Sequence, residues 1–126
     1  PVCEGEDVGV IPWSPLSGGF LTGKYERDAD APAGSRGEVS EHVEQKFTDA
    51  NWAVLDEIRA IADDHDATAA QVSLAWLLAQ DVVTAPIIGP KSSEQLQENL
   101  GALDVDLTSE EVERIAAPKT PQYPAE

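Results

Sequence analysis

Residues 82–88 form an apolar run in which polar and apolar positions do not alternate. A β-branched run without charge is typical of a strand buried on both faces of a parallel sheet. Residues 9–14 predict a second apolar strand, in which Pro12 supplies no ladder donor. Two strands cannot complete a parallel sheet, because such strands need neighbours on both edges and cover on both faces. We therefore expect an α/β fold that is incomplete on its own, with its missing partners in a longer polypeptide or a second copy.

Four helices are predicted between and after these strands. Apolar residues at three- and four-residue spacing predict the first helix from Thr48. Capping boxes, in which Ser or Thr precedes Gln or Glu by three positions, predict helix starts at Thr68, Ser92 and Thr108. Residues 25–47 are polar and predict a long surface loop, and residues 119–126 predict a frayed tail. The order of strand, loop, two helices, strand and two helices favours a parallel α/β sheet.

The charge balance excludes several classes of partner. The chain has 8 Lys and Arg against 24 Asp and Glu, and its net charge is −16. Nucleic acids and anionic membranes bind basic surfaces, so neither is an expected partner. At low salt the excess carboxylates repel one another, and such a composition indicates a salt-adapted protein.

The cysteine count and the hydropathy pattern predict a protein that stays inside the cell. A single Cys excludes a fold built on internal disulfides. The longest uncharged stretch, residues 8–23, holds two prolines and four glycines, which makes it too broken to span a bilayer as a helix. No secretory leader opens the sequence, and we expect a cytoplasmic protein.

Two segments carry candidate chemistry, and each follows a predicted strand. In the first loop (residues 14–24), Gly18 and Gly19 allow close approach of the backbone to a ligand, and Ser14 supplies a hydroxyl. In the second turn (residues 89–99), a helix N-terminus and Lys91 together predict an anion site. Phosphate sites recur after the last two strands of (β/α)8 barrels. His42 and His65 have no metal-ligand spacing, so no metal site is expected.

These segments resemble the aldo/keto reductase family. Residues 10–24, VIPWSPLSGGFLTGK, resemble the seventh strand of that family and its following loop. The helix QVSLAWLL (71–78), the segment PIIGPKSSEQLQENL (86–100) and LTSEE (107–111) are similar to later parts of the same barrel. The likeness runs in register over residues 1–117. It implies the C-terminal portion of a (β/α)8 TIM barrel, with about two strands and four helices, in an enzyme that reduces aldehydes or ketones with a nicotinamide cofactor.

The resemblance also implies which residues bind the dinucleotide. The pyrophosphate side is assigned to the first loop, at Ser14, Leu16, Gly18 and Leu21. The adenosine side is assigned to the second turn, at Gly89, Lys91, Gln95, Glu98 and Asn99. Lys91 lies where the family often has a cation near the 2′-phosphate, which favours NADPH. Gln95 lies where some members have Arg, so NADH stays an alternative cofactor.

The catalytic Asp, Tyr, Lys and His of the family lie in the first half of its barrel and map to no position here. We therefore expect the chain alone to be inactive, with a small carbonyl substrate only in the complete enzyme. Two alternatives remain open. The first is a non-catalytic truncated or interaction form of the same fold. The second is the phosphate-binding half of an unrelated barrel, which would bind a phosphosugar.

Overall fold

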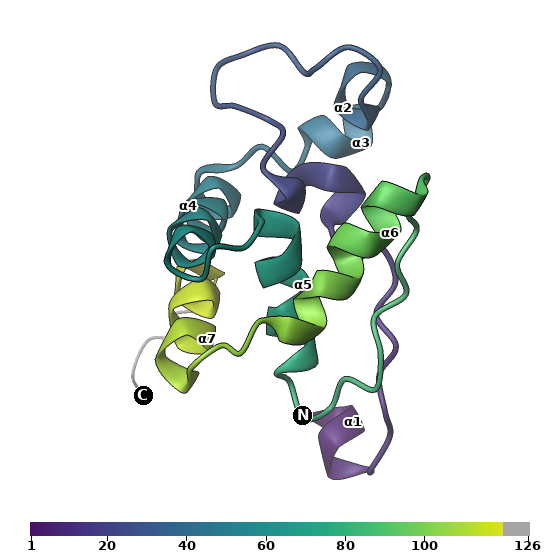
Figure 1. Cartoon of the computed structure of the whole chain (residues 1–126), viewed down its shortest axis with the longest axis vertical. Coiled ribbons are helices and arrows are strands. Elements are labelled where there is room, and N and C mark those ends of the chain that lie inside the picture. Colours follow the sequence, from purple (N-terminus) through teal and green to yellow (C-terminus); the bar gives the residue numbers. More distant parts are fainter. Residues whose placement is uncertain (120–126) are drawn as a thin grey trace.

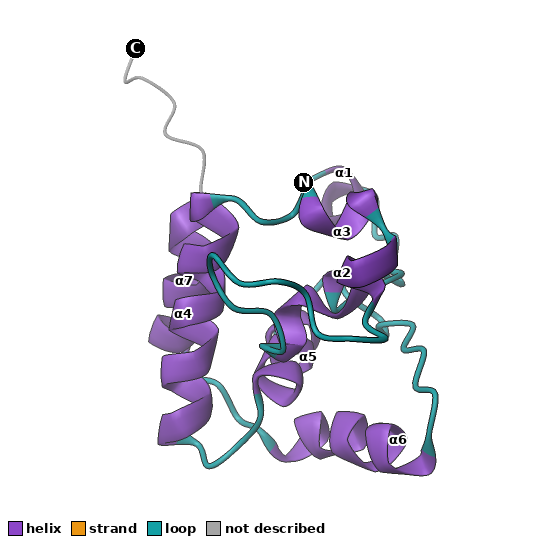
Figure 2. Ribbon diagram, turned by 90° about the horizontal axis from the view of Figure 1, so that it is seen from above, coloured by secondary structure: helices purple, strands orange, loops and turns teal. Residues whose placement is uncertain are grey.

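Helices gather on one side of two extended segments in the computed structural model, which describes residues 1–119 (Figure 1). The helices are α1 (Val2–Gly5), α2 (Arg36–Val39), α3 (Glu41–Glu44), α4 (Asp49–Asp64), α5 (Ala69–Leu78), α6 (Ser93–Leu100) and α7 (Ser109–Ala116), with 3-10 helices η1 (Ser17–Thr22), η2 (Gly101–Asp104) and η3 (Ala117–Lys119). Helices α4 and α7 lie side by side, and α5 packs between α4 and α6 (Figures 1 and 2). None of the described helices is long and apolar enough to cross a membrane.

The two predicted strands are extended segments that run parallel to each other. Two isolated bridges join them, Val10 with Val83 and Trp13 with Ile87. Two backbone hydrogen bonds of 2.8 Å, donated by the N–H groups of Val10 and Thr84, hold the first bridge. The parallel direction is as predicted, but Figure 2 shows no regular strand among the described residues. The prediction of two regular strands is therefore wrong for residues 1–119.

Proline explains why the ladder breaks between the bridges. Pro12 and Pro86 lie on the two segments between the bridged pairs, and neither supplies an N–H group. The two bridges are three positions apart along the first segment and four along the second, so the register shifts by one. An extra residue of this kind locally disrupts a ladder.

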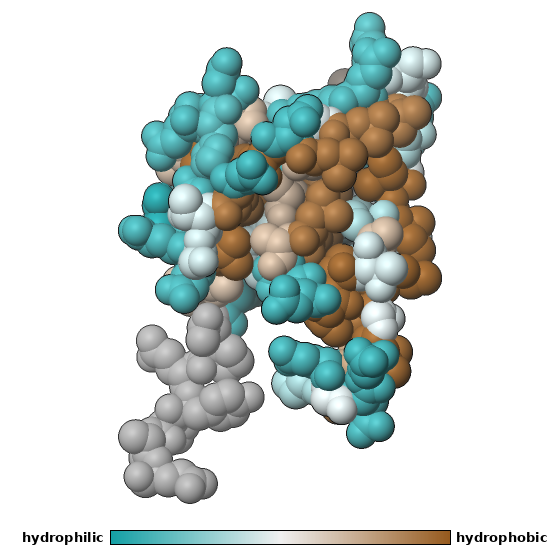
Figure 3. Space-filling view, turned by 60° about the horizontal axis from the view of Figure 1, so that its bottom comes forward, coloured by the Kyte–Doolittle hydropathy of each residue, from teal (hydrophilic) through white to brown (hydrophobic). Residues whose placement is uncertain are grey.

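The expected burial of residues 82–88 is also not observed. No side chain of this segment is buried by the described part of the chain, and Ile87 is 46% exposed. On the other segment, Ile11 is 61% and Trp13 82% exposed. Figure 3 shows apolar surface gathered on the side of the molecule along which these segments run. The side chains of both segments are largely apolar, as predicted, but no described element covers them.

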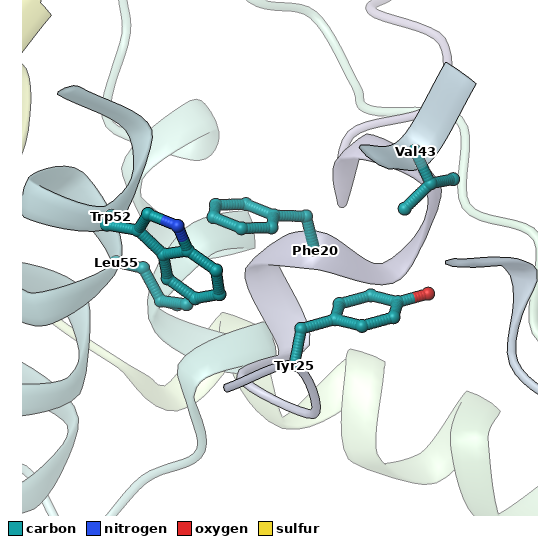
Figure 4. Close-up of a cluster of buried hydrophobic side chains, with 5 residues drawn as sticks. All are labelled: Phe20, Tyr25, Val43, Trp52 and Leu55. Carbon is teal, nitrogen blue, oxygen red and sulfur yellow. The ribbon is translucent and has the colours of Figure 1, made fainter. Parts of the chain in front are cut away.

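The apolar core lies where α4 packs against its neighbours. One cluster joins η1 and α3 to α4 (Figure 4), with the rings of Phe20 and Trp52 only 4.9 Å apart between centroids. Its buried members are Phe20, Tyr25, Val43, Trp52 and Leu55. The second cluster joins α4 to α5 and α7 through Ile58, Ile61, Ala62, Val72 and Ile115. The helix and the apolar face predicted from Thr48 onward are thereby confirmed.

The segment 25–47 differs from a purely polar surface loop. It contains α2 and α3, and the side chains of Tyr25 and Val43 are buried. The Tyr25 hydroxyl accepts a 3.0 Å hydrogen bond from the Gly37 N–H group. These two apolar anchors show no periodicity, which is why the sequence pattern did not reveal them. Of the expected tail, Lys119 ends η3 and residues 120–126 lie outside the described residues.

Side-chain caps set the N-terminal ends of two of the later helices. The predicted capping boxes at Thr68 and Thr108 are formed, and α5 and α7 begin directly after them. At the second, the Thr108 N–H group donates to Glu111 Oε2 at 2.8 Å. His65 Nε2 lies 2.8 Å from Glu111 Oε1, so His65 is half-buried rather than solvent-exposed as its acidic neighbours suggest. The hydrogen bond from the Thr108 backbone N–H group lowers the pKa of Glu111, and the nearby His65 lowers it further. Desolvation by partial burial raises the pKa, but the net shift is downward.

Glu111→Gln tests this cap, because glutamine keeps an acceptor for the Thr108 N–H group and removes only the charge. A carboxyl with a lowered folded pKa stabilises the fold above its unfolded pKa of about 4.3, and that contribution is lost as the pH falls through the folded pKa. We expect the variant to be less stable at neutral pH, with the difference in free energy of unfolding shrinking at acidic pH. Urea titrations across pH measure this difference. Glu110→Gln, in the same helical turn, is the control, and a difference independent of pH would contradict the charge argument.

Candidate functional site

A cavity of about 520 Å³, the loop cavity, lies between the first loop and the second turn. Both segments follow the paired extended segments, so the parallel bridges bring their ends to the same side of the molecule. Residues 34–36 form a further wall. Eight of the nine predicted site residues line this cavity: Ser14, Leu16, Gly18, Gly89, Lys91, Gln95, Glu98 and Asn99.

Leu21 is the predicted site residue that the structure does not bring to the loop cavity. Its side chain packs against both apolar clusters and lines a separate cavity of about 340 Å³ between α4, α5 and α7. Its carbonyl oxygen accepts a 3.3 Å hydrogen bond from the Ser73 hydroxyl. The turn of η1 directs the Leu21 side chain toward the helices. This apolar side chain thereby fixes the first loop to them.

The first loop has an unusual backbone. Ser14 and Ser17 have φ angles of 54° and 53°, and Gly18 and Gly19 have 68° and 96°. Residues other than glycine seldom occupy this left-handed region, at a cost of about 1–3 kcal/mol each, and such residues cluster at ligand sites. The φ of Gly19 disfavours any side chain, and a Cβ there would lie 2.7 Å from the Lys24 ammonium nitrogen and displace that flexible side chain. The loop therefore turns back on itself and places Lys24 against its own backbone.

Hydrogen bonds order the second turn before α6 begins. The Ser92 hydroxyl accepts a 3.2 Å hydrogen bond from the Gln95 N–H group, as the predicted capping box requires. The Gln95 side-chain oxygen, however, accepts from the Lys91 N–H group at 2.7 Å, which leaves the box at Ser92 half formed. Gln71 donates to the Glu98 carbonyl oxygen at 2.9 Å and holds α6 against α5. These contacts fix the backbone from which the Lys91 side chain extends.

The charges around the loop cavity run against those of the whole chain. Lys24, Arg36 and Lys91 line it with a single carboxylate, that of Glu98. Three of the chain's 8 basic residues thus face one cavity, although the chain has 24 acidic residues. Among the described residues, none of these three cations forms an ion pair, whereas Arg27, Arg59 and Arg114 do. This uncompensated positive charge suits an anionic ligand.

Two of these cations were not among the predicted site residues. Lys24 ends the Gly-rich stretch that predicted the first loop, so its position was a usable signal. Arg36 belongs to the segment 25–47, which has no pattern, and only the folded chain brings it to the cavity. Within residues 1–119, no cluster of His, Cys, Asp and Glu could hold a metal ion.

The sequence model of the aldo/keto reductase family matches residues 1–118. The chain is 33% identical to a probable aldo-keto reductase 1 of Glycine max, over 91% of this chain and 33% of that protein. It is 35% identical to the aldo-keto reductase yakc of Schizosaccharomyces pombe, whose name specifies NADP(+), over 90% of this chain and 33% of that protein. A probable voltage-gated potassium channel subunit beta of Arabidopsis thaliana is 30% identical over 97% of this chain and 40% of that protein.

The chain therefore spans one third to two fifths of the length of these relatives. The family match covers both walls of the loop cavity and overturns the alternative of an unrelated phosphosugar-binding barrel. A match of this extent, in register with the predicted loop and turn, shows that the chain belongs to the aldo/keto reductase family, whose fold is a TIM barrel.

Proposed function

We propose that this chain is the cofactor-binding part of an aldo/keto reductase that uses NADPH to reduce aldehydes or ketones to alcohols. The observation that carries the proposal is the loop cavity, where Lys24, Arg36 and Lys91 meet only one carboxylate. The pyrophosphate and the 2′-phosphate of NADPH are both anionic and suit these cations. A relative whose name specifies NADP(+) supports the same cofactor.

The dimensions and chemistry of the loop cavity fit part of a dinucleotide. Its volume of about 520 Å³ falls within the range of small-molecule sites. The first loop would hold the pyrophosphate, because Gly18 and Gly19 let the backbone approach and Lys24 supplies charge. The second turn would hold the adenosine end at Lys91, Gln95 and Asn99. When bound, the cofactor supplies the hydride that reduces the carbonyl carbon, and this chain's residues bind and orient it.

A second candidate function is a non-catalytic interaction role for the same fold. The apolar surface along the two extended segments favours it, since exposed patches of this kind mark interaction sites. One relative is named as a channel subunit rather than as a reductase. Carbonyl reduction separates the two candidates, because only the first requires it in the complete protein.

Lys91→Ala tests the assignment of the adenosine end. A charge-assisted hydrogen bond contributes about 1.5–3 kcal/mol, so NADPH affinity should fall roughly ten- to hundredfold and NADH affinity much less. Fluorescence titration of each reduced cofactor with the chain measures both constants. Lys46→Ala removes the same charge outside the loop cavity and is the matched control. Equal losses for the two cofactors would show that Lys91 does not contact the 2′-phosphate.

Gly19→Ala tests the first loop. A Cβ at this φ is strained and collides with the Lys24 ammonium, so the variant should lose affinity for NADPH and NADH by the same factor. Gly23→Ala is the control, because its φ of 79° carries similar strain, the added carbon makes only ordinary contacts of 3.5 Å or more, and Gly23 does not line the loop cavity. Urea unfolding and cofactor titration separate strain from lost binding. The prediction fails if both variants bind cofactor equally well.

The purified chain should not reduce aldehydes with NADPH. Hydride transfer to a carbonyl needs a positioned proton donor, and the family's catalytic residues match no position of this sequence. Loss of NADPH absorbance in the presence of an aldehyde is the assay. Turnover above the protein-free blank that Lys91→Ala abolishes would mean that the chain carries its own proton donor.

A further inference from the structure

The wall of the loop cavity contains one polar side chain that has no partner. Ser35 lines the cavity and is 9% exposed, and its hydroxyl oxygen is buried without a hydrogen bond to any described residue. Ser35 stands at the N-cap position of α2, yet its side chain makes no capping bond. Buried hydroxyls are nearly always hydrogen-bonded, so this one requires an explanation.

The backbone around Ser35 is, in contrast, well anchored. The Ser35 N–H group donates to the Pro32 carbonyl oxygen at 3.0 Å, and the Gly34 N–H group donates to Glu38 Oε2 at 2.6 Å. The Gly37 N–H group donates to the buried Tyr25 hydroxyl at 3.0 Å. The segment is therefore fixed to the end of the first loop, and the hydroxyl of Ser35 is the group left over. Its neighbour Arg36 is one of the three cations of the cavity.

We propose that Ser35 is a ligand-binding residue whose hydroxyl donates a hydrogen bond to a pyrophosphate oxygen of the bound dinucleotide, an inference that rests on the proposed function. A serine hydroxyl can turn about its side-chain bond to face an acceptor in the cavity. An anionic oxygen is a stronger acceptor than a neutral one. The ligand then satisfies a donor that the free chain leaves unpaired.

The position of the segment selects the pyrophosphate over the 2′-phosphate. Val43, in the helix pair that follows Ser35, lies 3.1 Å from where a Cβ of Gly18 would stand. Tyr25, which holds Gly37, directly follows Lys24 at the end of the first loop. The Ser35 segment thus packs on the first loop, and Lys91 extends from the second turn across the cavity. NADPH and NADH share the pyrophosphate, so Ser35 should serve both equally.

Ser35→Ala in the 126-residue chain tests the proposal with NADPH and NADH as probes. Both affinities should fall by about tenfold or more, and by the same factor. The urea midpoint of the free variant should stay unchanged or rise, because a buried unpartnered hydroxyl is removed. Ser40→Ala is the control, since Ser40 caps α3 without a side-chain hydrogen bond and does not line the cavity.

A binding role predicts weaker cofactor affinity with an unchanged or higher urea midpoint. A structural role predicts a lower urea midpoint. Unchanged cofactor affinity in Ser35→Ala overturns the proposal, and so does a lower urea midpoint or a failure to fold. A larger loss for NADPH than for NADH overturns the assignment to the pyrophosphate. Absence of cofactor binding by the unmodified chain would instead overturn the proposed function, which keeps the two failures distinguishable.

Discussion

The parallel pairing of the two extended segments is the interaction on which the candidate site depends. The hydrogen bonds at Val10 align residues 9–14 with residues 82–88, and both following segments then emerge at the same side of the molecule. The first loop and the second turn, far apart in the sequence, become opposite walls of one cavity. Helices α4, α5 and α7 supply the apolar core against which Leu21 fixes the first loop. Without this alignment, the cations of the two walls would not face a common ligand.

Charge is distributed unevenly in this chain, and the distribution bears on how an anion reaches the cavity. A net charge of −16 repels an anionic cofactor at long range, whereas the three cations attract it at short range. Salt shortens the reach of charge interactions from about 10 Å at 0.1 M to about 3 Å at 1 M. High salt therefore screens the distant carboxylates more than the direct contacts. Salt adaptation, which the composition predicts, stays a prediction and would favour binding at this cavity.

Some departures from local structural rules lie at the loop cavity, although Asp7, Asp28 and Asp66 also have positive φ and do not line it. The helices begin at side-chain caps and bury the faces that their spacing indicates, as at Thr68 and Thr108. The first loop, in contrast, holds Ser14 and Ser17 at positive φ, and Ser35 leaves a buried hydroxyl unpaired. Sequences satisfy such rules where stability decides, and break them most often at functional sites. Ser14 and Ser35 both line this cavity, so two of these exceptions lie where the proposed ligand would bind.

The sequence by itself determined the helices and most of the cavity walls. Caps and apolar spacing are local signals, so α4, α5 and α7 follow from them, and the resemblance of two contiguous segments to one family identified eight of the residues that meet at the cavity. Tertiary structure alone decided that Leu21 turns into the core and that Arg36, from a segment without pattern, joins Lys24 at the cavity. It also decided where the ladder breaks, because the pairing of the segments places Pro12 and Pro86 between the two bridges. Local pattern records which faces are apolar, but burial depends on what packs against them, and no described element covers residues 82–88.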